Sequence, residues 1–191
     1  LIYNKEKLRY EIDFDDLDKK LSHERARILL LCNPHNPGGR VWTRSELTRV
    51  AELCHKHGIR VVSDEIHCEL TLHDYSYTPF GSLPDELSYG SITCCSPSKA
   101  FNIAGLQIAN IVCRDAQVRE RIDRAININE VCDVNPFGVE ALMAAYTDGG
   151  EEWLNGLRQY ITANYEWLLQ HMAEALPHLP VMRMEGTYLA W

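Results

Sequence analysis

Residues 28–39 read ILLLCNPHNPGG, an unbroken apolar run followed by a loop rich in proline and glycine. Such a run is typical of a strand that is buried on both faces of a parallel sheet, and we expect one over 28–32. Thr43 and Glu46 then have the spacing of a helix capping box, and Gly58 is well suited to end the helix. This stretch therefore predicts a strand, a loop and a helix in that order.

The alternation continues along the chain. Apolar runs predict three further strands, at 59–63, 92–95 and 108–113. Helical periodicity predicts four further helices, at 15–21, 115–127, 136–147 and 151–176. An extended lead-in with a hairpin-like tip is expected over 1–14, and a loop with one short helix over 74–90. The pattern predicts an α/β fold with three layers, α/β/α, around a mostly parallel sheet.

Composition narrows the class of protein. The 191 residues are 46% hydrophobic and 24% charged, which is typical of a globular protein. The net charge of −8 argues against a nucleic-acid partner. No apolar run approaches the roughly 18 residues that a membrane span needs, so no membrane association is expected. None of the seven cysteines has Cys-x-x-Cys spacing, which favours reduced cysteines, a cytoplasmic location and no metal site.

Polar residues follow three of the predicted strands: Asn36, Asp64 and the run Ser96–Lys99. Ligands of parallel sheets bind beyond the carboxyl ends of the strands, so we expect these residues to share one site. A lysine amine can form a Schiff base, a carboxylate can keep a pyridine nitrogen protonated, and an amide can bond a ring oxygen. Taken singly, each residue has a structural interpretation as a surface lysine, a cap or a turn. Together they predict a site for pyridoxal phosphate.

Three motifs carry a resemblance to a known family: NPHNPGG at 33–39, SDEIH at 63–67 and SPSKAFN at 96–102. They resemble the class I/II aminotransferase superfamily of pyridoxal-phosphate enzymes (fold type I), and within it the C–S β-lyase branch of cystathionine β-lyase type. The resemblance implies a cofactor-binding large domain over 1–180 and the start of a C-terminal small domain over 181–191. The chain is expected to be truncated at both ends.

The resemblance also implies roles for individual residues. Lys99 corresponds to the lysine that holds the cofactor and removes the Cα proton. Asp64 corresponds to the partner of the ring nitrogen and Asn36 to the partner of the ring oxygen, with a cis bond suggested before Pro37. Ser96 and Ser98 correspond to phosphate contacts, although serine is also an ordinary turn residue.

Two positions depart from the aminotransferase pattern. His67 stands where many aminotransferases carry a tyrosine that bonds the ring oxygen, and we expect it to line the cofactor pocket. Gln107 stands where they carry an arginine that grips the phosphate. Both match the lyase branch. The alternative for His67 is a buried structural histidine.

The expected activity is cleavage of cystathionine or a cysteine S-conjugate to a thiol, ammonia and pyruvate. The alternatives are an aminotransferase acting on an amino acid and a 2-oxo acid, or a regulatory protein of this fold that binds a transcription activator. The family implies an amino-acid substrate and a homodimer of the full-length protein. The fragment alone is expected to be inactive, because family residues for the phosphate, the ring and the substrate carboxylate fall outside it.

Overall fold

The computed structural model describes residues 1–72 and 74–191. The chain opens with β1 (Ile2–Asn4) and β2 (Arg9–Glu11), which pair antiparallel and confirm the predicted hairpin. Helix α1 (Phe14–Leu21) follows and leads into the main sheet.

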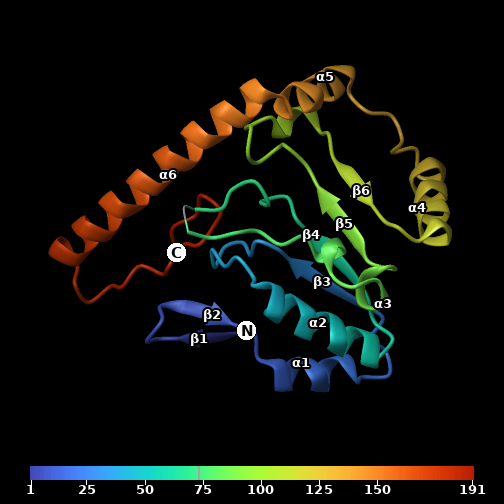
Figure 1. Ribbon diagram of the computed structural model, residues 1–191, viewed down its shortest axis with the longest axis horizontal. Helices are drawn as coiled ribbons and strands as arrows, with labels where there is room; N and C mark the ends of the chain where they lie inside the picture. The colour runs from blue at the N-terminus through green and yellow to red at the C-terminus, as the bar shows by residue number, and fades with distance from the viewer. Residues whose placement is uncertain (73) are drawn as a thin grey trace.

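The main sheet has four strands in the order β3-β4-β5-β6 (Figure 1). They are β3 (Ile28–Cys32), β4 (Arg60–Asp64), β5 (Ile92–Cys95) and β6 (Asn110–Val112). The first three are parallel, and β6 runs antiparallel to β5. The mostly parallel sheet of an α/β fold is therefore confirmed.

The remaining helices lie close to their predicted positions. They are α2 (Arg44–Lys56), α3 (Asp85–Ser88), α4 (Ala116–Ile128), α5 (Pro136–Ala145) and α6 (Asp148–Ala175), with short 3-10 turns η1 (Phe80–Ser82) and η2 (Ala104–Leu106). Thr43 and Glu46 form the predicted capping box of α2. Gly58 has a positive φ of 66°, which suits glycine at the end of that helix.

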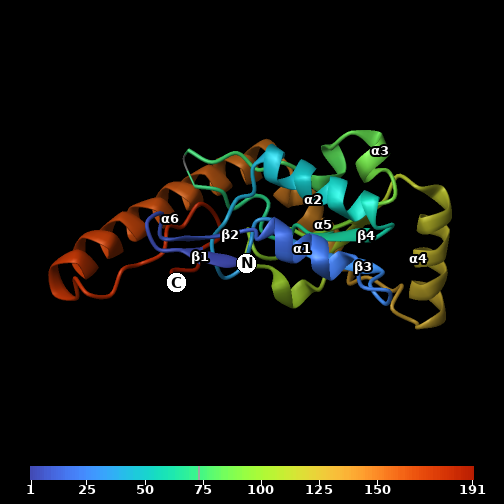
Figure 2. The same cartoon turned by 90° about the horizontal axis from the view of Figure 1, so that it is seen from below.

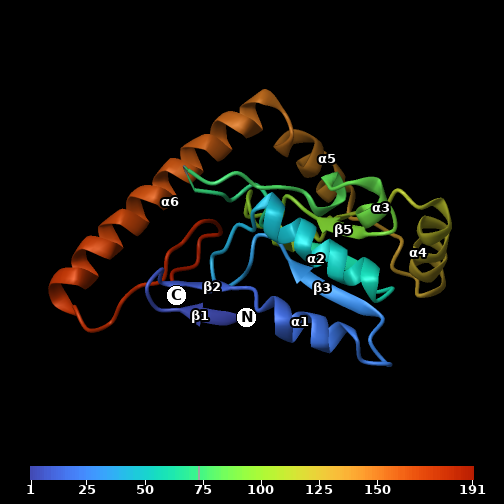
Figure 3. The same cartoon turned by 60° about the horizontal axis from the view of Figure 1, so that its bottom comes forward.

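Helices α1, α2 and α3 lie along one face of the sheet (Figures 2 and 3). Between them and the sheet lies a core that includes Leu31, Leu47 and Phe80. The prediction that β3 is buried on both faces is wrong. Leu31 is 9% exposed but Leu30 is 78% exposed, because alternate residues of a strand face opposite sides and these helices cover only one of them.

After the long helix α6, the chain returns to the loops that follow β3 and β4. Glu185 N donates to Gly39 O at 2.8 Å, and Thr187 N donates to Leu70 O at 2.7 Å. The segment 182–187 therefore packs against the end of the sheet that carries the polar motifs. The domain boundary at residue 180 stays a prediction.

Three further observations concern the cysteines, metal-binding side chains and membrane-spanning helices. All seven cysteines are free. Within residues 1–72 and 74–191, no group of three or more histidine, cysteine or acidic side chains is arranged to hold a metal ion. In the same residues, no helix combines the length and the apolar character that crossing a membrane requires.

Candidate cofactor site

The loops after β3, β4 and β5 leave the sheet together at its carboxyl edge. Asn33 N donates to Asp64 O at 2.9 Å, and Glu65 N donates to Cys94 O at 2.8 Å. These backbone bonds continue the pairing of Cys32 with Asp64 and of Asp64 with Cys94. The parallel sheet therefore brings the three predicted motifs to one edge.

Asn36 and His67 meet across this edge. Asn36 Nδ2 lies 3.4 Å from His67 Nε2. Since an amide nitrogen can only donate, we assign Nε2 of the neutral ring as the acceptor and place the ring proton on Nδ1. The Asn33–Pro34 and Asn36–Pro37 bonds are both cis, the second as the family resemblance suggests.

His67 is 2% exposed and lies between opposite charges. Burial lowers the pKa of its imidazole, the Asp64 carboxylate opposes this shift and the Lys99 ammonium adds to it. The Asp64 and Lys99 side chains thus both lie close enough to act on the same ring. Among the described residues, His67 Nδ1 has no hydrogen-bond partner although it is buried. An orphaned donor beside these charged groups fits a site for a ligand that carries acceptor oxygens.

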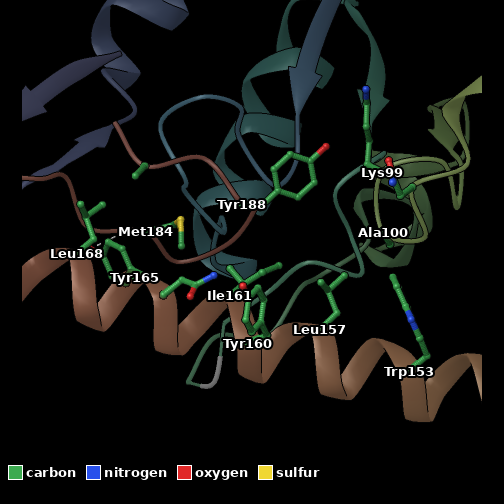
Figure 4. Close-up of a pocket in the computed structure, with 13 residues that line it drawn as sticks. Lys99, Ala100, Trp153, Leu157, Tyr160, Ile161, Tyr165, Leu168, Met184 and Tyr188 are labelled. Carbon is green, nitrogen blue, oxygen red and sulfur yellow. Dashed lines mark hydrogen bonds between the residues drawn. The ribbon is translucent and has the colours of Figure 1, made fainter.

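Lys99 lies in the turn after β5 and is half-buried. It lines a cavity of about 480 Å³ together with Met184, Tyr188 and side chains of α6. Figure 4 shows the α6 side chains rising toward Lys99 and Tyr188, and the amine end of Lys99 pointing away from α6. The Tyr188 ring stands edge-on to His67, with ring centroids 5.7 Å apart. The cavity therefore adjoins the Asn36–His67 pair.

The two serines before Lys99 are buried and bonded to each other. Their hydroxyl oxygens lie 2.5 Å apart, and both hydroxyls reach the Ile108 carbonyl. Ser98 N also donates to Ser96 Oγ at 3.1 Å. The two serines therefore stabilise the turn, as the structural interpretation expects. Their contact with the phosphate stays a prediction.

Gln107 immediately precedes the carbonyl that both serines contact. Its side chain is exposed, and its backbone adopts a left-handed conformation with φ 53° at the end of η2. Gln107 is not among the described residues that line the Lys99 cavity. Its phosphate role also stays a prediction.

Two residues near the site had no role in the sequence interpretation. Glu65 is 1% exposed, and its carboxylate accepts four hydrogen bonds. Tyr188 lines the cavity beside Lys99. The period-two geometry of a strand gives a signal for Glu65, since it must face away from Asp64. No local pattern points to Tyr188, because it reaches the site only through the return of the chain after α6.

The sequence matches a known protein family over almost its whole length. The family model of aminotransferase class I and II matches residues 2–191. The chain belongs to this family. It is 43% identical to cystathionine beta-lyase PatB of Bacillus subtilis (strain 168) over 95% of the chain and 47% of that protein. It is 33% identical to protein MalY of Escherichia coli (strain K12) over 94% of the chain and 45% of that protein.

A solved structure of the same fold contains the predicted cofactor. The crystal structure of cystalysin from Treponema denticola, which contains pyridoxal 5'-phosphate, matches all of this chain and 48% of its own with a TM-score of 0.95 and 33% identity. The predicted family and fold are therefore confirmed, and the predicted cofactor is the one that the cystalysin structure contains. The chain spans about half the length of the proteins it matches.

Proposed function

We propose that this chain is the cofactor-binding part of a pyridoxal-phosphate-dependent C–S β-lyase. The observation that carries the proposal is the convergence of the segments after β3, β4 and β5 at the carboxyl edge of the sheet, where Asn36 lies 3.4 Å from His67. The relation to a protein named cystathionine beta-lyase supports it. The substrate would be cystathionine or another cysteine S-conjugate, cleaved to a thiol, ammonia and pyruvate.

The residues of the chain have distinct tasks in this reaction. The Lys99 amine would hold the cofactor aldehyde and, once released by substrate, accept the Cα proton. The Asp64 carboxylate would hold a proton on the ring nitrogen. Asn36 and His67 would direct their donors toward the ring oxygen. When bound, pyridoxal phosphate supplies the electron sink that makes loss of the Cα proton and of the β-thiolate accessible.

The phosphate would lie at the turn before Lys99. Ser96 and Ser98 offer hydroxyl donors there, provided that they exchange their bonds to the Ile108 carbonyl for bonds to the phosphate. Gln107 would add an uncharged donor, which is weaker than an arginine contact.

The first test is covalent capture of the cofactor. The chain is mixed with pyridoxal phosphate, reduced with borohydride and mapped by peptide mass spectrometry. We expect the reduced adduct on Lys99, its loss in Lys99→Ala, and its retention in Lys20→Ala, which removes an exposed lysine of α1. An adduct spread evenly over surface lysines would contradict the proposed site.

The alternative activity is amino transfer, which the family name itself favours. The two reactions differ after the Cα proton has left: the lyase expels a β-thiolate, whereas the transaminase returns the proton to the cofactor. Product analysis with the complete protein, cystathionine and an added 2-oxo acid as amino-group acceptor separates them. A free thiol with pyruvate supports the lyase, and a 2-oxo acid with a new amino acid supports the transaminase.

We further propose that the complete protein is a cytoplasmic homodimer with an amino-acid substrate, and that residues 1–180 and 181–191 belong to its large and small domains. Exposed apolar side chains such as Phe137, at 75%, and Ile128, at 67%, support burial against further protein. Sedimentation of the complete protein tests the dimer, and a monomer at all concentrations would exclude it.

A further inference from the structure

Glu65 lies next to Asp64 but faces the other side of the sheet. Successive residues of β4 alternate between faces, so Ser63 and Glu65 point toward the core under α2, and Asp64 points the opposite way. The Glu65 side chain is 1% exposed and Ser63 is fully buried. A buried carboxylate is costly unless its oxygens are bonded.

Four donors surround the Glu65 carboxylate. Oε1 accepts from Ser63 Oγ at 2.7 Å, from Phe80 N at 2.9 Å and from Asn33 Nδ2 at 3.4 Å. Oε2 accepts from the Tyr77 hydroxyl. Burial and the charge of Glu65 raise the pKa of Tyr77, so this hydroxyl keeps its proton and acts as the donor.

These bonds join three segments that are separate in the sequence. Asn33 begins the loop that carries Asn36, and Ser63 belongs to the strand that ends at Asp64. Tyr77 and Phe80 belong to the segment between β4 and α3. Asn33 is held twice more, by Nδ2 donating to Thr78 O at 3.0 Å and by N donating to Asp64 O at 2.9 Å.

We propose that Glu65 is a positioning residue for the cofactor site. Its carboxylate fixes the direction in which the Asn36 loop leaves β3 relative to the end of β4. From the opposite face of the sheet, it thereby determines the position of the Asn36 amide relative to the Asp64 carboxylate. Glu65 touches neither cofactor nor substrate. This inference rests on the proposed function, because the site that it positions is the pyridoxal-phosphate site.

The test compares three variants of the complete protein. Glu65→Gln keeps the shape of the side chain but removes its charge. Tyr77→Phe removes one donor from the far side of the same carboxylate. Glu52→Gln is the matched control, since this carboxylate lies exposed on α2 and, among the residues that the structure describes, forms an ion pair only with Arg49.

Three quantities are measured: the dissociation constant for pyridoxal phosphate, the pH midpoint of the visible band of the Lys99 adduct, and hydrogen exchange of residues 33–39 without cofactor. We expect Glu65→Gln to weaken binding by about tenfold, the scale seen when outer partners of a metal ligand are removed. It should also shift the pH midpoint and speed exchange in 33–39. Tyr77→Phe should act in the same direction but less, and Glu52→Gln should match the wild type.

The outcomes separate this inference from the proposed function. If Glu65→Gln lowers only the thermal stability, and exchange, affinity and pH midpoint stay at wild-type values, the positioning role is overturned. If Glu65→Gln does not fold, the same readouts in Tyr77→Phe decide. If the wild type itself forms no Lys99 adduct, the proposed function fails, and the positioning of a cofactor fails with it. Faster hydrogen exchange of residues 33–39 in Glu65→Gln would then still identify Glu65 as the anchor of that loop.

Discussion

At His67, burial and three charged groups act on one imidazole: Lys99 lowers its pKa, and Asp64 and Glu69 raise it. The ring accepts from Asn36 and stands edge-on to Tyr188, so it has little freedom to move. Burial is the largest influence on its pKa and lowers it, which favours the neutral ring. A neutral ring with its proton on Nδ1 can donate one hydrogen bond, as a tyrosine does at this position in many aminotransferases.

The lowered pKa of His67 predicts a dependence of stability on pH. Below the ordinary histidine pKa of about 6.5, the unfolded chain binds a proton that the folded ring resists. The stabilisation is therefore complete above that pH and is lost as the pH falls toward the lower folded value. When the free energy of unfolding is measured in urea between neutral and mildly acidic pH, His67→Gln should reduce the slope with which it falls as the pH is lowered.

Two further variants make this measurement specific. Burial also lowers the pKa of His35, so His35→Gln should remove another part of the slope. His178→Gln, at an exposed position after α6, should leave it unchanged. An unchanged slope in His67→Gln would show that the ring is already free to take up a proton in the folded chain.

At this scale, the sequence predicts residues whose chemistry and position agree. Asn36 and Lys99 follow strands and Asp64 ends one, and parallel pairing alone is enough to bring them to one edge. Glu65 stands in the same motif, but its partners Tyr77 and Phe80 come from a loop whose path no local pattern determines. Tyr188 depends in addition on where α6 turns back.

At the scale of the elements, α2 depends on the bonds at its first turn. Thr43 Oγ1 accepts from Glu46 N at 3.2 Å, and Glu46 in turn accepts from Thr43 N at 2.8 Å. Thr43→Ala should lower the free energy of unfolding by about 1 kcal/mol, the usual cost of a lost N-cap. Ser45→Ala removes a hydroxyl that lies 3.1 Å from Thr43 Oγ1 but is not part of the capping box, and should cost less in the same urea titration. Equal losses would argue against the capping role.

Strand β3 offers two neighbouring leucines that face opposite ways. Leu31 is 9% exposed and belongs to the core, whereas Leu30 is 78% exposed. Leu31→Ala should lower the free energy of unfolding by about 2–5 kcal/mol through lost burial and a cavity. Leu30→Ala should change it little. Comparable losses in chemical unfolding would mean that the Leu30 face is covered in solution.

The same strand shows what an element-level prediction misses. Five consecutive apolar residues predict a strand but contain no alternation, so they cannot tell a strand covered on both faces from one covered on one. The cap and the end of α2 are predictable because the bonds that form them lie within a few residues. Coverage of a face depends on other parts of the protein.

At the scale of the whole molecule, a buried ion network ties the two ends of the chain to the middle. Arg40 Nε donates to Glu185 Oε2 at 2.9 Å, and Arg40 Nη2 donates to Glu46 at 2.8 Å. Arg9 also reaches Glu185, at 3.1 Å. Arg40 and Glu185 are each 1% exposed, so neither charge has access to water. Glu185 therefore fixes the segment before Tyr188 onto the loop after Asn36.

Removing Glu185 from this network should be costly, because the buried Arg40 guanidinium then keeps Glu46 but loses its buried carboxylate partner. Glu185→Gln should lower the free energy of unfolding by about 3 kcal/mol, at the lower end of what a broken buried pair costs. Glu120→Gln, at an exposed position on α4, serves as the matched control. Because Glu185 also positions Tyr188, the variant should loosen the segment that carries this ring as well, which faster hydrogen exchange of residues 185–189 would report. A loss no larger than that of the control would mean that Glu46 and the Tyr10 carbonyl are enough to hold Arg40, and that the return of the chain to the site depends on its backbone bonds to Gly39 and Leu70 instead.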